Sequence, residues 1–172
     1  IYFGSLPSTG REESWKDIDL ESPKGIIKKT VQRGIEPKSK VSLTFTGDYK
    51  WNRDNNYALR SMVSVLQIKL REILREDMSG TYGTRVTASS LHIPREGYSI
   101  SISFGCDPDR SEELTRTVFE VIDSLKTYQV ETMYITKVSE TQKRSYETNI
   151  KRNRFWLSNL VQYSFHERNP EL

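Results

Sequence analysis

The sequence predicts an α+β fold, with an antiparallel sheet and helices packed on one of its faces. Segments 40–47 and 98–105 alternate apolar with hydroxyl side chains, which predicts strands that are apolar on one face only. Residues 54–78 instead repeat apolar side chains at i, i+3, i+4 and i+7, as an amphipathic helix does. Strands with one polar face favour an antiparallel sheet over a parallel sheet buried on both sides.

The predicted order of elements is β-β-α-β-β-α-α-α. Residues 1–25 contain several Pro and Gly residues, so we expect an incoming linker there, with 1–3 as the tail of a truncated helix. A single α+β domain is expected over 26–172. It would begin with a short strand at 26–33, which would neighbour the strand at 40–47.

The helix over 54–78 has Asp54 as its expected N-cap and Gly80 as the left-handed residue just past its end. A strand is expected at 82–93, with a bulge near Ser89 where the alternation breaks. Glu96-Gly97 would form the hairpin turn into the strand at 98–105. Helices are expected over about 110–126, 131–151 and 154–165.

Composition narrows the classes of function. The chain has 172 residues and a net charge of +3, which does not by itself indicate a nucleic-acid-binding protein. No apolar run approaches the ~18 residues of a membrane span. The single cysteine, Cys106, excludes an internal disulfide and is expected to be a buried thiol. Because the sequence starts without Met, we expect a piece of a longer or processed polypeptide.

Catalytic and metal-binding motifs are absent from the sequence. The two histidines, His92 and His166, cannot form an H-x-x-E-H or H-E-x-x-H zinc motif, and His166 is expected to be a surface residue. No P-loop, G-x-G-x-x-G or G-x-S-x-G motif occurs. The basic tract 143–155 is either a phosphate-binding stripe or the solvated face of a helix.

One face of the predicted sheet carries small hydroxyl side chains. Such a surface is polar without being bulky, which suits an enclosed face against which a peptide must fit. The alternative is an ordinary solvent-exposed sheet that uses Ser and Thr. The residues of this hydroxyl face are Ser42, Thr44, Thr46, Thr87, Ser89, Ser99, Ser101 and Ser103.

Arg75 and Tyr82 lie on the two sides of a short helix-to-strand turn. Arg75 brings a charged fork of donors, and Tyr82 brings one O–H donor that stays protonated at neutral pH. Together they would suit a peptide carbonyl, or the oxyanion formed from it. Alternatively, Arg75 is a cation favoured by the helix dipole, and Tyr82 is a strand-edge aromatic.

The segment LREILREDMSGTYGTRV (70–86) resembles the C-terminal-half motif of the pitrilysin/insulysin family of zinc metallopeptidases. Members carry a helix ending in an Arg, a short Gly-containing turn, and a Tyr seven residues after the Arg. Four further stretches resemble the family in the same order. They are GSLPS (4–8), KSKVSLTFTG (38–47), FGCDPDR (104–110) and NRFWLSNL (153–160).

The resemblance implies a part of an enzyme whose two halves close around a chamber. The N-terminal half would hold H-x-x-E-H and the zinc, and this chain would bind no metal. Arg75 and Tyr82 would bind the substrate backbone and stabilise the transition state. The chamber would be lined by Ser42, Thr44, Thr46, Ser99, Ser101 and Ser103. The partners would be the zinc-binding half and a peptide, and the fragment alone would be inactive.

Two alternatives stay open at this point. Some members of the superfamily have lost catalysis and act as scaffolds or assembly subunits. A basic α+β nucleic-acid-binding module is the second alternative, although no aromatic side chains stand on the polar face to stack bases. The family occurs in periplasm, cytosol and organelles. The single cysteine and the absence of a glycosylation sequon favour a bacterial periplasm or cell envelope, or the cytosol.

Overall fold

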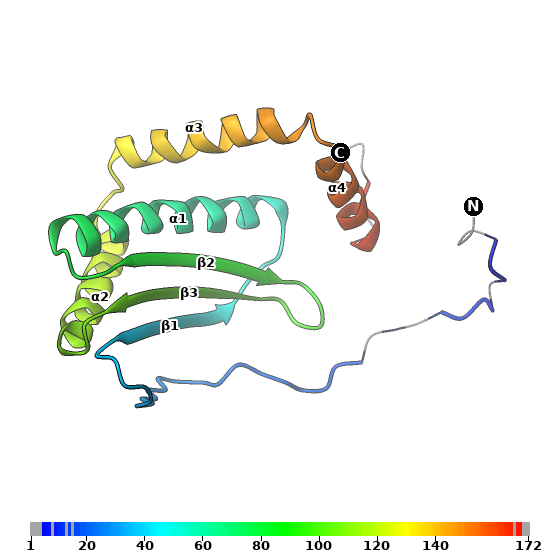
Figure 1. Ribbon diagram of the computed structural model, residues 1–172. Helices are drawn as coiled ribbons and strands as arrows, with labels where there is room; N and C mark the ends of the chain where they lie inside the picture. Colours follow the sequence, from blue (N-terminus) through cyan, green and yellow to red (C-terminus); the bar gives the residue numbers. More distant parts are fainter. Residues whose placement is uncertain (1–4, 8, 13, 15, 167, 170–172) are drawn as a thin grey trace.

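The computed structural model shows a small sheet covered on one face by helices (Figure 1). The strands are β1 (Ser39–Asp48), β2 (Gly83–Leu91) and β3 (Gly97–Cys106), and they form an antiparallel sheet in the order β1-β3-β2. The predicted α+β class is therefore confirmed. The structure describes residues 5–7, 9–12, 14, 16–166 and 168–169, so the expected helix tail at 1–3 lies outside it.

The helices form two layers over one face of the sheet. In Figure 1, α1 (Arg53–Arg71) lies along the sheet, and α3 (Thr132–Asn149) lies on the far side of α1. The other helices are α2 (Ser111–Thr127), which follows a single 3-10 turn at Pro108–Arg110, and α4 (Asn153–Phe165). Helix α1 continues directly into a π-helical segment, η1, over Glu72–Asp77. No helix of the described residues is long and apolar enough to cross a membrane.

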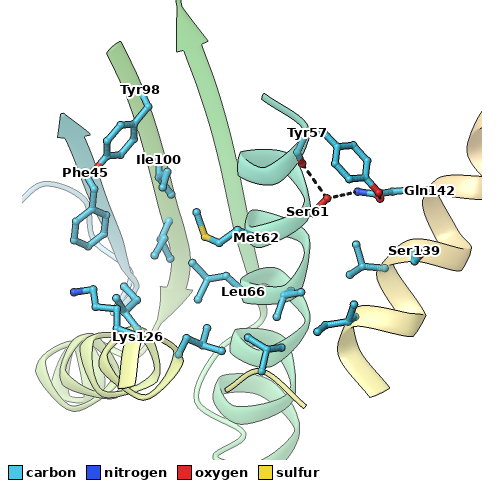
Figure 2. Close-up of a pocket in the computed structure, with 17 residues that line it drawn as sticks. Phe45, Tyr57, Ser61, Met62, Leu66, Tyr98, Ile100, Lys126, Ser139 and Gln142 are labelled. Atoms are coloured by element: carbon cyan, nitrogen blue, oxygen red, sulfur yellow. Dashed lines mark hydrogen bonds between the residues drawn. The ribbon is translucent and has the colours of Figure 1, made fainter. Parts of the chain in front are cut away.

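An apolar groove of about 740 Å³ opens between α1, α2, α3 and the apolar face of the sheet. Figure 2 shows Phe45 and Ile100 of the strands and Met62 and Leu66 of α1 facing it. Its rim is polar where Gln142 Nε2 of α3 donates to the hydroxyl of Ser61 on α1 (3.0 Å). The groove offers apolar surface and few groups that could carry chemistry.

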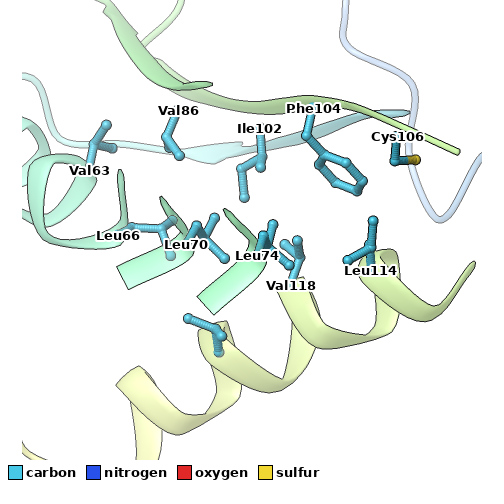
Figure 3. Packing of buried hydrophobic residues seen from close by; sticks show 11 residues of the cluster. Val63, Leu66, Leu70, Leu74, Val86, Ile102, Phe104, Cys106, Leu114 and Val118 are labelled. Atoms are coloured by element: carbon cyan, nitrogen blue, oxygen red, sulfur yellow. The ribbon is translucent and has the colours of Figure 1, made fainter. Parts of the chain in front are cut away.

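The core lies where α1, η1 and α2 meet the sheet (Figure 3). Leu70 and Leu74 are fully buried, and so are Ile102 of β3 and Leu114 of α2. Truncating a leucine at such a position costs about 2–5 kcal/mol. Cys106 belongs to this cluster, as expected, and burial raises the pKa of its thiol. The core thus fixes the end of α1 and η1 firmly against the sheet.

The predicted strand at 26–33 is wrong, because no strand forms there. Ile26 and Val31 are almost fully exposed, and the first strand of the described chain begins at Ser39. The physical reason is that a strand depends on a partner for its hydrogen bonds and cross-strand contacts. Among the described residues, no neighbour pairs with this segment.

Four details of the elements also differ from prediction. Asn52, not Asp54, caps α1, since its side chain accepts the Asn55 N–H at 2.7 Å. The β2–β3 register runs without a break, so no bulge forms near Ser89. Gly97 begins β3 instead of lying in the turn. The left-handed residue after η1 is Ser79 (φ 47°), not Gly80.

Candidate functional site

The site is built where α1 gives way to β2. The helix widens into η1, and its last bond runs from Met78 N–H to Ile73 O (3.0 Å), five residues back. Such π-helical segments are rare and often occur at functional sites. The chain then reverses through Ser79, and Gly80 N–H donates to Leu74 O (2.9 Å). Arg75 therefore lies just before an unusual turn that is closed by two backbone hydrogen bonds.

Buried residues hold both sides of this turn. Leu74 is fully buried, and Thr81 is only 8% exposed. The Thr81 hydroxyl donates to Gly105 O of β3 (2.7 Å) and accepts the Gly83 N–H (3.1 Å). From α2, the Arg110 guanidinium donates to Met78 O (3.1 Å). The turn is thereby tied to the central strand and to a second helix.

Arg75 and Tyr82 each follow one of the buried anchors, Leu74 and Thr81. Arg75 is exposed, and Tyr82 is 85% exposed. Within the described part of the chain, neither side chain has a hydrogen-bond, ion-pair or cation–π partner. Both donors are thus available to a ligand at one rigid turn. Their roles in binding stay predictions.

The residues of the predicted hydroxyl face lie side by side on one face of the sheet. The register sets Ser42 opposite Ser103, and Thr44 opposite Ser101, whose hydroxyl oxygens are 3.4 Å apart. The next row pairs Thr46 with Ser99. On β2, Thr87 and Ser89 oppose Ser101 and Ser99, so all eight residues share the face that the helices leave uncovered. That this face lines a chamber stays a prediction.

The two histidines are closer together than their separation in sequence suggests. Both pack on Trp51, with ring centroids 4.6 Å (His92) and 4.4 Å (His166) from the indole, and Arg168 lies over the same ring at 4.3 Å. Burial lowers the pKa of His166, with smaller contributions from His92 and Arg168. His166 is therefore a packing residue that fixes the end of α4, not an isolated surface feature.

One other candidate feature is weakened by the structure. The basic tract 143–155 is not one helix, because α3 ends at Asn149 and α4 begins at Asn153. Its cations are thus divided between two helices and their connection. In the part of the chain that the structure describes, no three His, Cys, Asp or Glu side chains gather as potential metal ligands.

The α+β unit described above matches a domain that occurs in known peptidases. Residues 2–137 match the family model described as the peptidase M16 inactive domain. The chain therefore belongs to the peptidase M16 family, and the resemblance to zinc metallopeptidases is confirmed at this level. This family includes zinc proteases, as the relatives described next illustrate.

Three known proteins are similar to this chain in sequence or in fold. It is 36% identical over 92 residues to a probable zinc protease PqqL of Haemophilus influenzae, covering 52% of this chain and 10% of that protein. The crystal structure of the periplasmic protease PqqL from Escherichia coli shares the fold (TM-score 0.67, 22% identity, 74% of this chain and 14% of that one). So does the ferredoxin protease FusC, solved as a point mutant in complex with Arabidopsis ferredoxin (TM-score 0.67, 17% identity, 77% and 15%). The chain thus spans only about a tenth to a seventh of these relatives.

Proposed function

We propose that this chain is part of the C-terminal half of a zinc metallopeptidase, where it binds the peptide substrate and stabilises the transition state. The observation that carries this proposal is the pair of unpartnered donors, Arg75 and Tyr82, on one anchored turn of an M16 inactive domain. Because one relative is a probable zinc protease and another is periplasmic, we place the intact enzyme in the bacterial cell envelope.

In this proposal, the N-terminal half would hold the zinc, which would supply an activated water and a Lewis acid for the carbonyl. The residues of this chain bind and orient. The Arg75 guanidinium donates to a substrate carbonyl and holds the backbone in place. The Tyr82 hydroxyl donates to the oxygen that becomes negatively charged. Because Leu74 and Thr81 are buried next to Arg75 and Tyr82, the backbone that carries both donors would not need to rearrange when the substrate binds.

The test is Tyr82→Phe in the complete protein, with a quenched fluorogenic peptide as substrate. We expect turnover to fall by about 10²-fold, the scale of losing one oxyanion donor. Tyr128→Phe is the matched control, because Tyr128 is also exposed (71%) but lies after α2, away from the turn. Turnover within twofold of the unmodified enzyme would show that Tyr82 has no such role.

A further inference from the structure

A hollow of about 410 Å³ lies at one end of the hydroxyl face, beside Tyr82 in the chain. Its floor is one row of the sheet in which two of the three residues are glycine. The register sets Lys40 of β1 opposite Gly105 of β3, and Gly105 opposite Gly83 of β2. The two neighbouring glycines leave two of the three positions in this row without side chains, so the surface is open there.

There is room for a side chain at both glycine positions. A Cβ built on Gly83 meets no atom within 4 Å, and one on Gly105 meets only Ser39 O at 3.8 Å. The glycines are therefore not required by close packing at these positions. What they provide is room for an external group directly above the backbone of two strands.

Two cations flank the hollow, and both lack partners. Lys40 and Arg85 are exposed, and neither forms an ion pair or hydrogen bond with any described residue. They stand on either side of β3, and strands lie ~4.8 Å apart, so both long side chains can reach over the glycines. Ser103, in the row with Arg85, adds a hydroxyl without a partner among the described residues.

Among the described residues, no acidic side chain lines this hollow. The nearest acid along β3, Asp107, uses its carboxylate to accept the Asp109 N–H at 3.0 Å. Two other arginines of the chain are neutralised locally: Arg110 pairs with Glu113, and Arg95 pairs with three carboxylates. The positive charge of Lys40 and Arg85 at the hollow is thus not balanced by any described carboxylate.

We propose that this hollow binds a carboxylate of a peptide. Arg85 would donate a fork of N–H groups, Lys40 a point charge and Ser103 a hydroxyl, which together match a carboxylate. That the peptide is a substrate rests on the proposed function. Because Gly83 directly follows Tyr82, the carboxylate would then lie a few residues from the bond to be cleaved. It comes either from an acidic side chain or from the peptide's C-terminus.

Titration of this chain, followed by NMR, tests the proposal without any cleavage. The probes are an acetylated, amidated hexapeptide with a central Glu, the same peptide with Gln, and the Gln peptide with a free C-terminal carboxylate. We expect the Glu peptide, the free-acid peptide or both to shift the amides of Gly83, Ser103 and Gly105. The amidated Gln peptide leaves them unchanged. If the Glu peptide causes the shifts, the carboxylate comes from a side chain; if the free-acid peptide causes them, it comes from the C-terminus.

Charge substitutions make the test specific. Lys40→Gln and Arg85→Gln are each expected to weaken binding by about threefold, the scale of one exposed ion pair, and added salt weakens it further. Lys143→Gln on α3 removes the same charge from a distant exposed position and should change nothing. If neither carboxylate peptide shifted these amides more than the amidated Gln peptide does, or if both substitutions left binding unchanged, the proposal would be overturned. Because this readout needs no zinc half, its failure is distinct from failure of the Tyr82→Phe test.

Discussion

At the scale of single residues, the turn between η1 and β2 depends on how closely its backbone approaches α2. Gly80 is buried, and a Cβ placed on it would lie 2.5 Å from Leu114 Cδ2 and 3.2 Å from Leu114 Cδ1. Leu114 is itself fully buried in the core, so it has little freedom to move away. Gly80 thus serves packing, while Ser79 adopts the left-handed conformation.

We therefore predict that Gly80→Ala destabilises the chain by about 1–3 kcal/mol, the usual cost of overpacking a core. The free energy of unfolding in urea measures it. Gly83→Ala, three residues on, is the control, because its Cβ would enter open space. If the two substitutions had equal effects on stability, close packing at Gly80 would not be the reason for its glycine.

At the scale of elements, helix α1 protects one edge of the sheet. The Gln67 side-chain amide donates to Thr84 O (2.9 Å) and accepts the Val86 N–H (2.7 Å). It thus satisfies the two backbone groups that a further strand would otherwise pair with. Helix propensity and apolar periodicity predict α1 well, but they say nothing about which polar side chain reaches a strand edge.

Gln67→Ala should destabilise the chain by about 1–3 kcal/mol, because both backbone groups of β2 lose a buried partner. Urea unfolding gives the value, and amide exchange at Val86 reports the local effect. Gln129→Ala, in the exposed connection after α2, is the control and should lie within about 0.5 kcal/mol of the unmodified chain. Unchanged exchange at Val86 would contradict the capping role.

The attachment of α4 should depend on pH through His166. Burial lowers the pKa of this imidazole in the folded state, so the unfolded chain binds a proton more readily. Its contribution to stability is therefore complete above the ordinary pKa of 6.5 and declines as the pH falls below that value. We expect faster amide exchange in α4 at pH 5 than at pH 7, after correction for intrinsic rates.

His166→Asn should remove much of that pH dependence and loosen the packing on Trp51 at both pH values. His92 contacts both Trp51 and His166 but is hydrogen-bonded to Glu96 at 3.0 Å. His92→Asn is the comparison variant, because it removes the other imidazole that packs on Trp51. An unchanged exchange profile in His166→Asn would rule out this account.

The sequence predicts most elements because their patterns are local. Strands at 40–47 and 98–105, and the helix at 54–78, appear nearly where the alternation and the helical period place them. The strand at 26–33 fails because pairing, not composition, decides a strand. The Trp51 cluster and the hollow at Gly83 and Gly105 depend on contacts between distant segments, which no local pattern contains. The roles of Arg75 and Tyr82 are predicted only from their spacing and from the family resemblance.

At the scale of the whole molecule, the chain spans about a tenth of its curated relative, and the proposed chemistry is divided between two halves. We predict that this chain alone does not cleave a quenched fluorogenic peptide. Mixed with a zinc-loaded N-terminal half of the same protein, it should restore cleavage. The reason is that, in the proposed function, Arg75 and Tyr82 would only assist a reaction for which the other half would supply the zinc and the activated water.

The controls separate the proposed peptidase from a scaffold. Activity of the mixture should be lost on chelation of zinc and should fall by about 10²-fold with Tyr82→Phe in this chain. The N-terminal half must first be shown to be folded and metal-bound. If that half is folded, holds its metal and binds this chain, yet the mixture does not cleave the peptide, then the two parts assemble without catalysis. The chain would then belong to a structural subunit of the family. The reason is that the two parts would bind each other, while the donors of Arg75 and Tyr82 would act on no substrate.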